Sequence, residues 1–433
     1  MTSRQVKAFI KWIVIFNVFF LAGTYIFHSY FYKIINGDWK TGSSIKYILV
    51  EFSLANENVT AAWYSSMLFL SLGVLCLFCY LLHKKTFTVK KEKNLSYGWL
   101  IFSVVFALLS LDEMASLHER LGNINQLNPL GDYPLGWVYL LAIPIILVIG
   151  FMLWFCLLQL KKAPWAAYFA IIALLLFASI PVQEYIEVRQ WHAVEDRAGW
   201  QRPVVFLIIE EGSELFGATF MIIACLIFAA YTSKPDSKTF SFSIKATLEL
   251  NKGKLVSQSV VGIIILALLM ISIVKNDLLI LEGDHGRREN WFPSATAFLT
   301  SIICFYLYFK EKHRVFYFTA LFSLFVSAYF GGNIYAFLVN PTESVLESII
   351  LIILCLFTLA LAVWLFLTIK DNYSRFAIIV WAIVVIISFG LFTWYAAALA
   401  FLGFSAFLIS LIRIIALDIP LAISQPIPNK EIL

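Results

Sequence analysis

Long uninterrupted stretches of hydrophobic residues dominate the sequence, and short polar segments separate them. A helix needs roughly 20 apolar residues to cross the hydrocarbon core of a bilayer, which is about 30 Å thick. Runs of that kind lie near residues 9–31, 59–82, 97–121, 137–160, 165–187, 203–231, 256–274, 295–309, 315–339, 346–369 and 376–417. The pattern therefore predicts an all-α, polytopic membrane protein.

The last of these runs is too long for a single crossing, since it would measure about 63 Å as one helix. We interpret it as a hairpin that turns near residues 400–404. This interpretation gives about 12 transmembrane segments. The alternative is a single span followed by a re-entrant or interfacial piece.

Basic residues in the short loops indicate the orientation of the chain. Most of the 32 Lys and Arg residues fall on the side of the N-terminus, which predicts that both termini face the cytoplasm. A Lys-rich segment at 232–257 forms the longest inner loop. We therefore expect two groups of six helices, residues 1–231 and 258–433, joined by this cytoplasmic linker.

Composition excludes several classes of protein and supports the membrane assignment. Hydrophobic residues make up 61% of the chain and charged residues only 14%, whereas soluble domains carry about 45–50% and about 25%. The net charge of +5 comes from scattered residues, so we expect membrane lipids as partners and no nucleic acid. Short loops without a long soluble domain favour a bacterial cytoplasmic membrane.

Acidic residues are less evenly distributed, and they gather at the outer ends of three predicted helices. The third helix ends in a stretch with Asp112, Glu113, His118 and Glu119, and the fifth in one with Glu184, Glu187 and His192. The sixth begins with a stretch that carries Glu210, Glu211 and Glu214. At about 100° per residue, each helix can direct its acids to a common interior. We expect a shared, partly buried chamber.

Carboxylates grouped in a medium of low dielectric are costly unless they are protonated, paired or bound to a cation. Carboxylates with neutral imidazoles suit Zn or Mn, and carboxylates alone suit Mg. We expect a divalent metal, Zn, Mg or Mn, with candidate catalytic residues Asp112, Glu113, Glu210 and Glu214. The candidate ligands are His118, Glu119, Glu184, Glu187, Glu211 and His192.

The outer loop between the seventh and eighth helices adds His285, Arg287 and Arg288. Paired arginines can clamp a phosphate group. These residues are the candidates for binding a lipid-linked, phosphorylated or other anionic substrate.

The favoured function is a metal-dependent membrane hydrolase or transferase whose active site opens to the extracytoplasmic face. One alternative is a cation- or proton-coupled transporter, although the inner halves of the three helices are almost purely apolar. A further alternative is a non-catalytic subunit or sensor. For each acid taken singly, the competing interpretation is a solvated cap at a helix end.

All six cysteines fall inside apolar runs, and Cys76 and Cys79 have C-x-x-C spacing. This spacing is compatible with redox or metal chemistry. We favour the interpretation that they are small apolar residues on one helix face.

Overall fold

The computed structural model describes residues 3–31, 51–54, 59–86, 94–115, 136–160, 163–193, 202–233, 290–332, 344–389 and 394–417. The chain divides into two compact units, Met1–Thr247 and Leu248–Leu433. Within the described residues the fold is all-helical and contains no strand. The predicted fold class is therefore confirmed in its coarse form.

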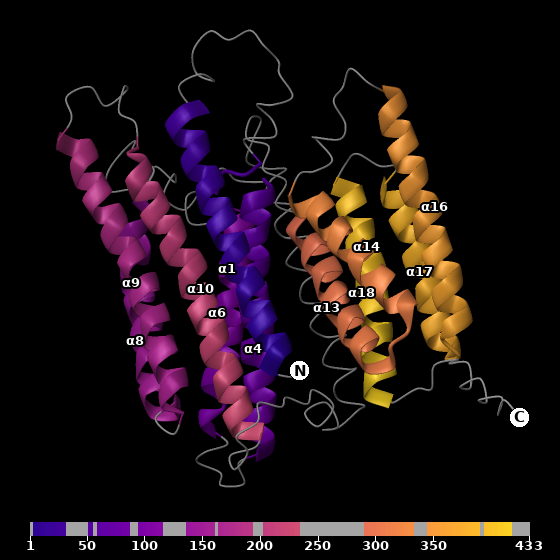
Figure 1. Ribbon diagram of the computed structural model, residues 1–433, viewed down its shortest axis with the longest axis horizontal. Coiled ribbons are helices and arrows are strands. Elements are labelled where there is room, and N and C mark those ends of the chain that lie inside the picture. The colour runs from indigo at the N-terminus through magenta and orange to yellow at the C-terminus, as the bar shows by residue number, and fades with distance from the viewer. Residues whose placement is uncertain are drawn as a thin grey trace, which may run out of the picture. The chain divides into compact units, whose positions relative to one another are not determined.

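Unit 1 contains six long helices and one π-helical turn among its described residues. They are α1 (Ser3–Ile26), η1 (Phe27–Phe31), α4 (Thr60–Thr86), α6 (Tyr97–Ala115), α8 (Gly136–Gln159), α9 (Pro164–Ala193) and α10 (Val204–Ser233). The closest packing is between α4 and α6 and between α9 and α10, and α4 also packs on α10. The helices of this unit run side by side (Figure 1).

Small residues allow the helices of unit 1 to approach one another closely. Ser66 of α4 donates a hydrogen bond of 2.6 Å to the carbonyl oxygen of Ser110 in α6. A Cβ atom at Gly73 would lie 3.1 Å from the Ser103 carbonyl oxygen. Close backbone approach at small residues is the usual basis of helix packing in lipid, because apolar tails remove the hydrophobic driving force between helices.

Unit 2 contains five helices among its described residues: α13 (Trp291–Glu311), α14 (Arg314–Gly331), α16 (Ser344–Thr368), α17 (Asn372–Phe389) and α18 (Trp394–Leu417). Ser294 and Ser327 each donate to the other's carbonyl oxygen, at 2.9 and 2.8 Å, and so join α13 to α14. Trp381 is fully buried and stacks on Phe407, with ring centroids 4.7 Å apart.

The last hydrophobic run does form two helices, but the predicted position of the turn is wrong. Residues 400–404 lie inside α18, which begins at Trp394, whereas α17 ends at Phe389. Gly403 serves packing rather than turning, because a Cβ atom there would lie only 3.2 Å from Val384 Cγ1 of α17. The missing side chain lets the two helices approach each other at this point.

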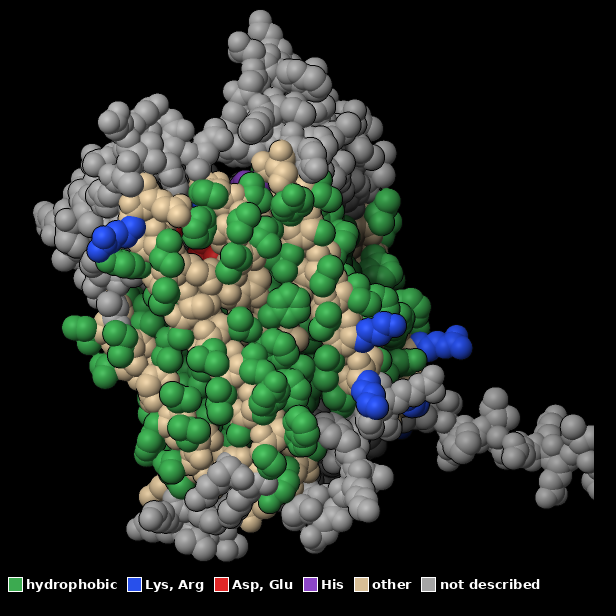
Figure 2. Space-filling model, turned by 60° about the vertical axis from the view of Figure 1, so that its left-hand side comes forward, with side chains coloured by type: hydrophobic (Ala, Val, Ile, Leu, Met, Phe, Trp, Pro, Cys, Tyr) green, Lys and Arg blue, Asp and Glu red, His purple; other side chains and the backbone are tan. Residues whose placement is uncertain are grey.

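Eight of the described helices are long and apolar enough to cross a membrane, and three shorter apolar helices accompany them. The protein is therefore an integral membrane protein by the length and composition of its helices. On one face of the molecule apolar side chains cover most of the described surface, and acidic side chains are visible only as a small patch (Figure 2). The predicted seventh helix at 256–274 and most of the linker at 232–257 lie outside the described residues. The count of about 12 and the orientation remain predictions.

Candidate functional site

The acidic residues of α6, α9 and α10 lie at one end of unit 1. Glu113 follows Tyr97, the first residue of α6, by about 24 Å of helix. On α9, Arg189 lies over the ring of Tyr185, with 5.5 Å between the guanidinium carbon and the ring centroid. Tyr and Arg in this arrangement are typical of the membrane–water boundary. The acidic side chains therefore lie toward one end of the candidate membrane spans.

Four glutamates from these three helices come together, and we call Glu113, Glu184, Glu211 and Glu214 the carboxyl cluster. Glu214 is hydrogen-bonded to Glu113, and Glu184 and Glu211 lie near enough for their charges to act on Glu214. Glu184 is buried, with 3% of its surface exposed, and the other three are half-buried. The shared location expected from the sequence is thus present for these four residues.

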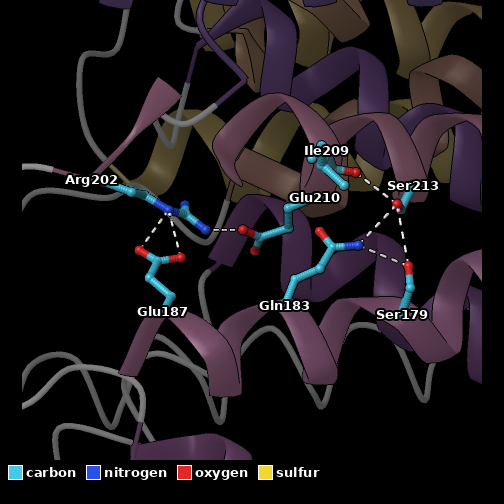
Figure 3. A network of polar contacts seen from close by, with 7 residues as sticks. All are labelled: Ser179, Gln183, Glu187, Arg202, Ile209, Glu210 and Ser213. Atoms are coloured by element: carbon cyan, nitrogen blue, oxygen red, sulfur yellow. Dashed lines mark hydrogen bonds and ion pairs between the residues drawn. The ribbon is translucent and has the colours of Figure 1, made fainter. Parts of the chain in front are cut away.

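A second layer of charge lies beside the carboxyl cluster, where Arg202 joins α9 to α10. Arg202 Nε lies 2.8 Å from Glu187 Oε1, and a second nitrogen of the guanidinium group contacts Glu210. Figure 3 shows Arg202 between these two carboxylates. The side chain of Glu187 is 5% exposed and that of Glu210 13%. One cation therefore compensates two nearly buried anions.

Uncharged polar side chains continue the contact between α9 and α10 toward the interior of unit 1. Gln183 Nε2 donates to Ser179 Oγ at 2.8 Å and to Ser213 Oγ at 3.3 Å, and Ser213 donates to the carbonyl oxygen of Ile209 (Figure 3). Gln183 Oε1 is buried and has no hydrogen-bond partner among the described residues. A buried acceptor of this kind is typically satisfied by water or by a ligand.

Three phenylalanines close the interior side of the site, and we call Phe69, Phe106 and Phe177 the aromatic layer. Phe106 and Phe177 precede Glu113 and Glu184 by seven residues, which is two helical turns, so each ring lies about 10 Å below a glutamate on the same helix face. The ring centroids of the three residues lie 6.0–6.4 Å apart. The carboxyl cluster is therefore separated from the other end of unit 1 by packed apolar groups.

The residues after α1 form the rim of this end. His28 Nε2 lies 3.0 Å from Ser53 Oγ, and Arg202 is near enough for its charge to act on His28. Glu51 accepts two hydrogen bonds of 2.7 Å from Thr60, at the start of α4. Burial raises the pKa of the Glu51 carboxyl group, and the hydrogen bonds from Thr60 offset only part of this shift.

The structure describes only some of the predicted site residues. Glu113, Glu184, Glu211 and Glu214 come together, whereas Glu187 and Glu210 pair with Arg202. Asp112 is half-buried and is not among the groups that act on Glu214. The predicted positions outside the described residues or side chains are His118, Glu119, His192, His285, Arg287 and Arg288.

Among the described residues, no three His, Cys, Asp or Glu side chains are arranged to hold one metal ion. The donors that the carboxyl cluster offers are oxygens, which suit Mg²⁺ or Mn²⁺. The imidazoles that favoured Zn²⁺ belong to side chains outside the described part.

Sequence reasoning missed the roles of Ser179, Gln183, Ser213 and Arg202. A signal was present, because Ser179, Gln183 and Glu187 recur at every fourth residue and so share one face of α9. The sequence could not show which residues contact that face, since Ser213 lies on α10 and Arg202 lies just before α10.

A comparison with protein families matches residues 12–229 to the family described as "Domain of unknown function (DUF8692)". No curated protein and no solved structure matches the chain. The matched residues run from α1 to α10 and therefore include every described member of the site. Since the match covers half of the chain, the protein belongs to the DUF8692 family.

Proposed function

We propose that the protein is an integral membrane enzyme, a hydrolase or transferase, whose active site is the carboxyl cluster of unit 1. The observation that carries this proposal is the contact between Glu113 and Glu214, with Glu184 and Glu211 beside it. Three helices that are separate in sequence contribute these groups. Ionisable residues within membrane helices are rare, and they usually mark a functional site.

The proposed chemistry is general acid–base catalysis. A hydrogen bond between two carboxyl groups needs one proton, so one member of the Glu113–Glu214 pair is an acid while the other is a base. Such a pair can donate a proton to a leaving group and accept one from a nucleophile. Glu184 and Glu211 lie near enough for their charges to act on this pair.

Arg202 is the positioning residue of the site, because it holds Glu187 on α9 to Glu210 on α10. A lipid-linked or phosphorylated substrate fits a site at the membrane boundary, where the apolar portion of the substrate can remain in lipid. His285, Arg287 and Arg288 remain the sequence-based candidates for holding its anionic group. A bacterial cytoplasmic membrane remains the expected location.

A divalent cation remains part of the proposal. Because the described carboxylates alone do not form a metal site, the ion would also need donors outside the described residues, Glu119 for Mg²⁺ or Mn²⁺ and His118 or His192 for Zn²⁺. When bound, the ion would supply positive charge to stabilise an anionic transition state.

Transport is the less favoured function, because alternating access requires a route to both sides of the membrane. The aromatic layer lies directly below the carboxyl cluster, and Phe69 and Phe106 are buried, with 3% and 1% of their surfaces exposed. A one-sided site is what an enzyme acting at one face needs.

The test uses protein purified without chelators and incubated with a panel of lipid phosphates and phosphodiesters. Wild-type protein should release phosphate or transfer the head group, and Glu113→Gln and Glu214→Gln should each lower the rate at least about 100-fold. Asp371→Asn in unit 2 is the matched control and should retain the wild-type rate. Elemental analysis of the same preparations measures any bound divalent metal.

Two outcomes would overturn the proposal. One is a rate that Glu113→Gln and Glu214→Gln leave unchanged in folded protein. The other is solute uptake into sealed vesicles that depends on a pH gradient and is lost in the same variants, which would establish transport instead.

A further inference from the structure

The four cysteines of unit 1 converge at a point well removed from the carboxyl cluster. Cys76 and Cys79 come from α4, Cys156 from α8 and Cys225 from α10, and all four are fully buried. Cys225 lies about 16 Å along α10 from Glu214. The C-x-x-C pair that the sequence places on one helix face therefore meets a third and a fourth thiol from other helices.

Within this group, Cys76 and Cys225 are the pair in direct sulfur contact. Their Sγ atoms lie 3.8 Å apart. Cys79 Sγ instead approaches the carbonyl oxygen of Cys225, at 3.6 Å. Cys156 lies near enough to act electrostatically on both members of the pair. A disulfide requires an S–S distance of about 2.05 Å, so the two sulfurs need to approach by less than about 2 Å.

One titratable side chain, His83, lies in the same interface between α4 and α10. His83 follows Cys76 by seven residues, so both occupy one face of α4. The His83 ring lies 6.0 Å from that of Phe228, which follows Cys225 by three residues on α10. Thiol oxidation proceeds through a thiolate. His83 lies about 10 Å along α4 from Cys76, so the oxidant itself must take up the protons of the two thiols.

The surroundings of the thiols limit which oxidant can reach them. Leu77 on α4 and Leu153 and Leu157 on α8 are exposed on the lipid-facing surface of these helices. The thiols themselves are inaccessible to water. An oxidant that reaches these fully buried thiols must pass between apolar helices, which favours an apolar reagent over charged glutathione.

We propose that Cys76 and Cys225 form a redox-active dithiol that a lipid-soluble oxidant of the quinone class converts to a disulfide linking α4 to α10. The two S–H bonds break and one S–S bond forms. The two electrons and two protons reduce the quinone to a quinol. Cys79 and Cys156 are the neighbouring thiols for exchange with this disulfide. The proposal is independent of the enzymatic function.

The experiment uses the full chain, reduced and then reconstituted in lipid nanodiscs, with decylubiquinone added. Non-reducing proteolysis and mass spectrometry should detect a peptide pair joined through Cys76 and Cys225 and lacking two hydrogen atoms. Oxidised glutathione at the same concentration should give at least about tenfold less of this linked pair.

Variants identify the pair and provide the control. Cys76→Ser and Cys225→Ser should each abolish the linkage, whereas the Cys304→Ser/Cys355→Ser double variant in unit 2 should form it as wild type does. The proposal is overturned if all six thiols of the wild-type protein remain open to alkylation after unfolding. A linkage that joins other cysteines also overturns the assignment. Both of these results come from wild-type protein, so they do not depend on whether a variant folds.

Discussion

Units 1 and 2 are built from similar apolar helices, but they place their charged groups differently. In unit 2 the described charged side chains lie at helix ends or in short connections. Asp371 accepts hydrogen bonds from the Ser374 amide and hydroxyl groups, and Arg375 donates to the carbonyl oxygens of Phe366 and Ile369. In unit 1, by contrast, glutamates from three helices lie near enough for their charges to act on one another, and Glu113 is hydrogen-bonded to Glu214.

The difference between the units indicates which polar groups stabilise the fold and which are candidates for a function. Charges at helix ends in unit 2 pair with end groups of the same or an adjoining helix, as Asp371 does with Ser374 and with Arg413 of α18, so they stabilise helix termini. The carboxyl cluster requires three helices to be correctly packed, and it concentrates like charges, which costs stability. A costly arrangement that the fold does not need is typical of a functional site, and it lies within the residues that match the DUF8692 family.

The largest effect on stability should come from removing Arg202. Arg202→Met leaves Glu187 and Glu210 without the cation that pairs them, and both carboxylates are nearly buried. Breaking a buried ion pair costs about 3–5 kcal/mol, and partial exposure of Arg202 reduces this to about 2–3 kcal/mol. Thermal and denaturant unfolding in detergent would measure the loss.

The matched change in unit 2 is Lys310→Met, which removes a more exposed ion pair with Glu311. This substitution should cost less than about 1 kcal/mol. Equal losses for the two variants would contradict the distinction between the units.

A smaller effect is expected where glycines allow helices to pack. A Cβ atom at Gly217 of α10 would lie 2.8 Å from the Phe177 ring, so Gly217→Ala must displace a ring of the aromatic layer. We expect a loss of about 1–3 kcal/mol. Gly403→Ala in unit 2 meets Val384 at 3.2 Å and should cost less. Unfolding free energies of the two variants would decide the order, and a reversed order would contradict it.

The smallest effect concerns pH, and its sign should differ between the units. Burial raises the pKa of Glu51 above its ordinary value of 4.5. Its stabilising contribution is therefore present below pH 4.5 and is lost as the pH rises through the folded-state pKa. Burial also opposes ionisation of Asp371. The hydrogen bonds from Ser374 and the charge of Arg413 outweigh this effect of burial, so the pKa of Asp371 is lowered. That contribution is present above pH 3.8 and is lost as the pH falls.

Unfolding of Glu51→Gln and Asp371→Asn, each compared with wild type across acidic pH, would measure these contributions. Each should be about 1 kcal/mol or less. Contributions that change in the same direction with pH would show that the two environments do not differ as described.

The sequence predicted the helical segments well because hydrophobic run length is a direct physical requirement of the bilayer. It also predicted that Glu113, Glu184, Glu211 and Glu214 share a location, since each lies near one end of its hydrophobic run and helical phase groups the acids of each helix. It did not predict the pairing of Glu187 and Glu210 with Arg202, because the choice of counter-ion depends on which helices pack together. The meeting of Cys76 with Cys225 escaped notice for the same reason, and Gly403 was included in a turn although it serves packing.

The central claim is that the glutamates of α6 and α10 act as one unit, and a double-mutant cycle on Glu113 and Glu214 tests it most directly. Unfolding free energies would be measured for Glu113→Gln, Glu214→Gln and the double variant, with Glu113→Gln/Asp371→Asn as the reference pair. The account predicts a coupling energy above about 1 kcal/mol for Glu113 with Glu214, and additivity within about 0.5 kcal/mol for Glu113 with Asp371. Additive effects of Glu113→Gln and Glu214→Gln would contradict it.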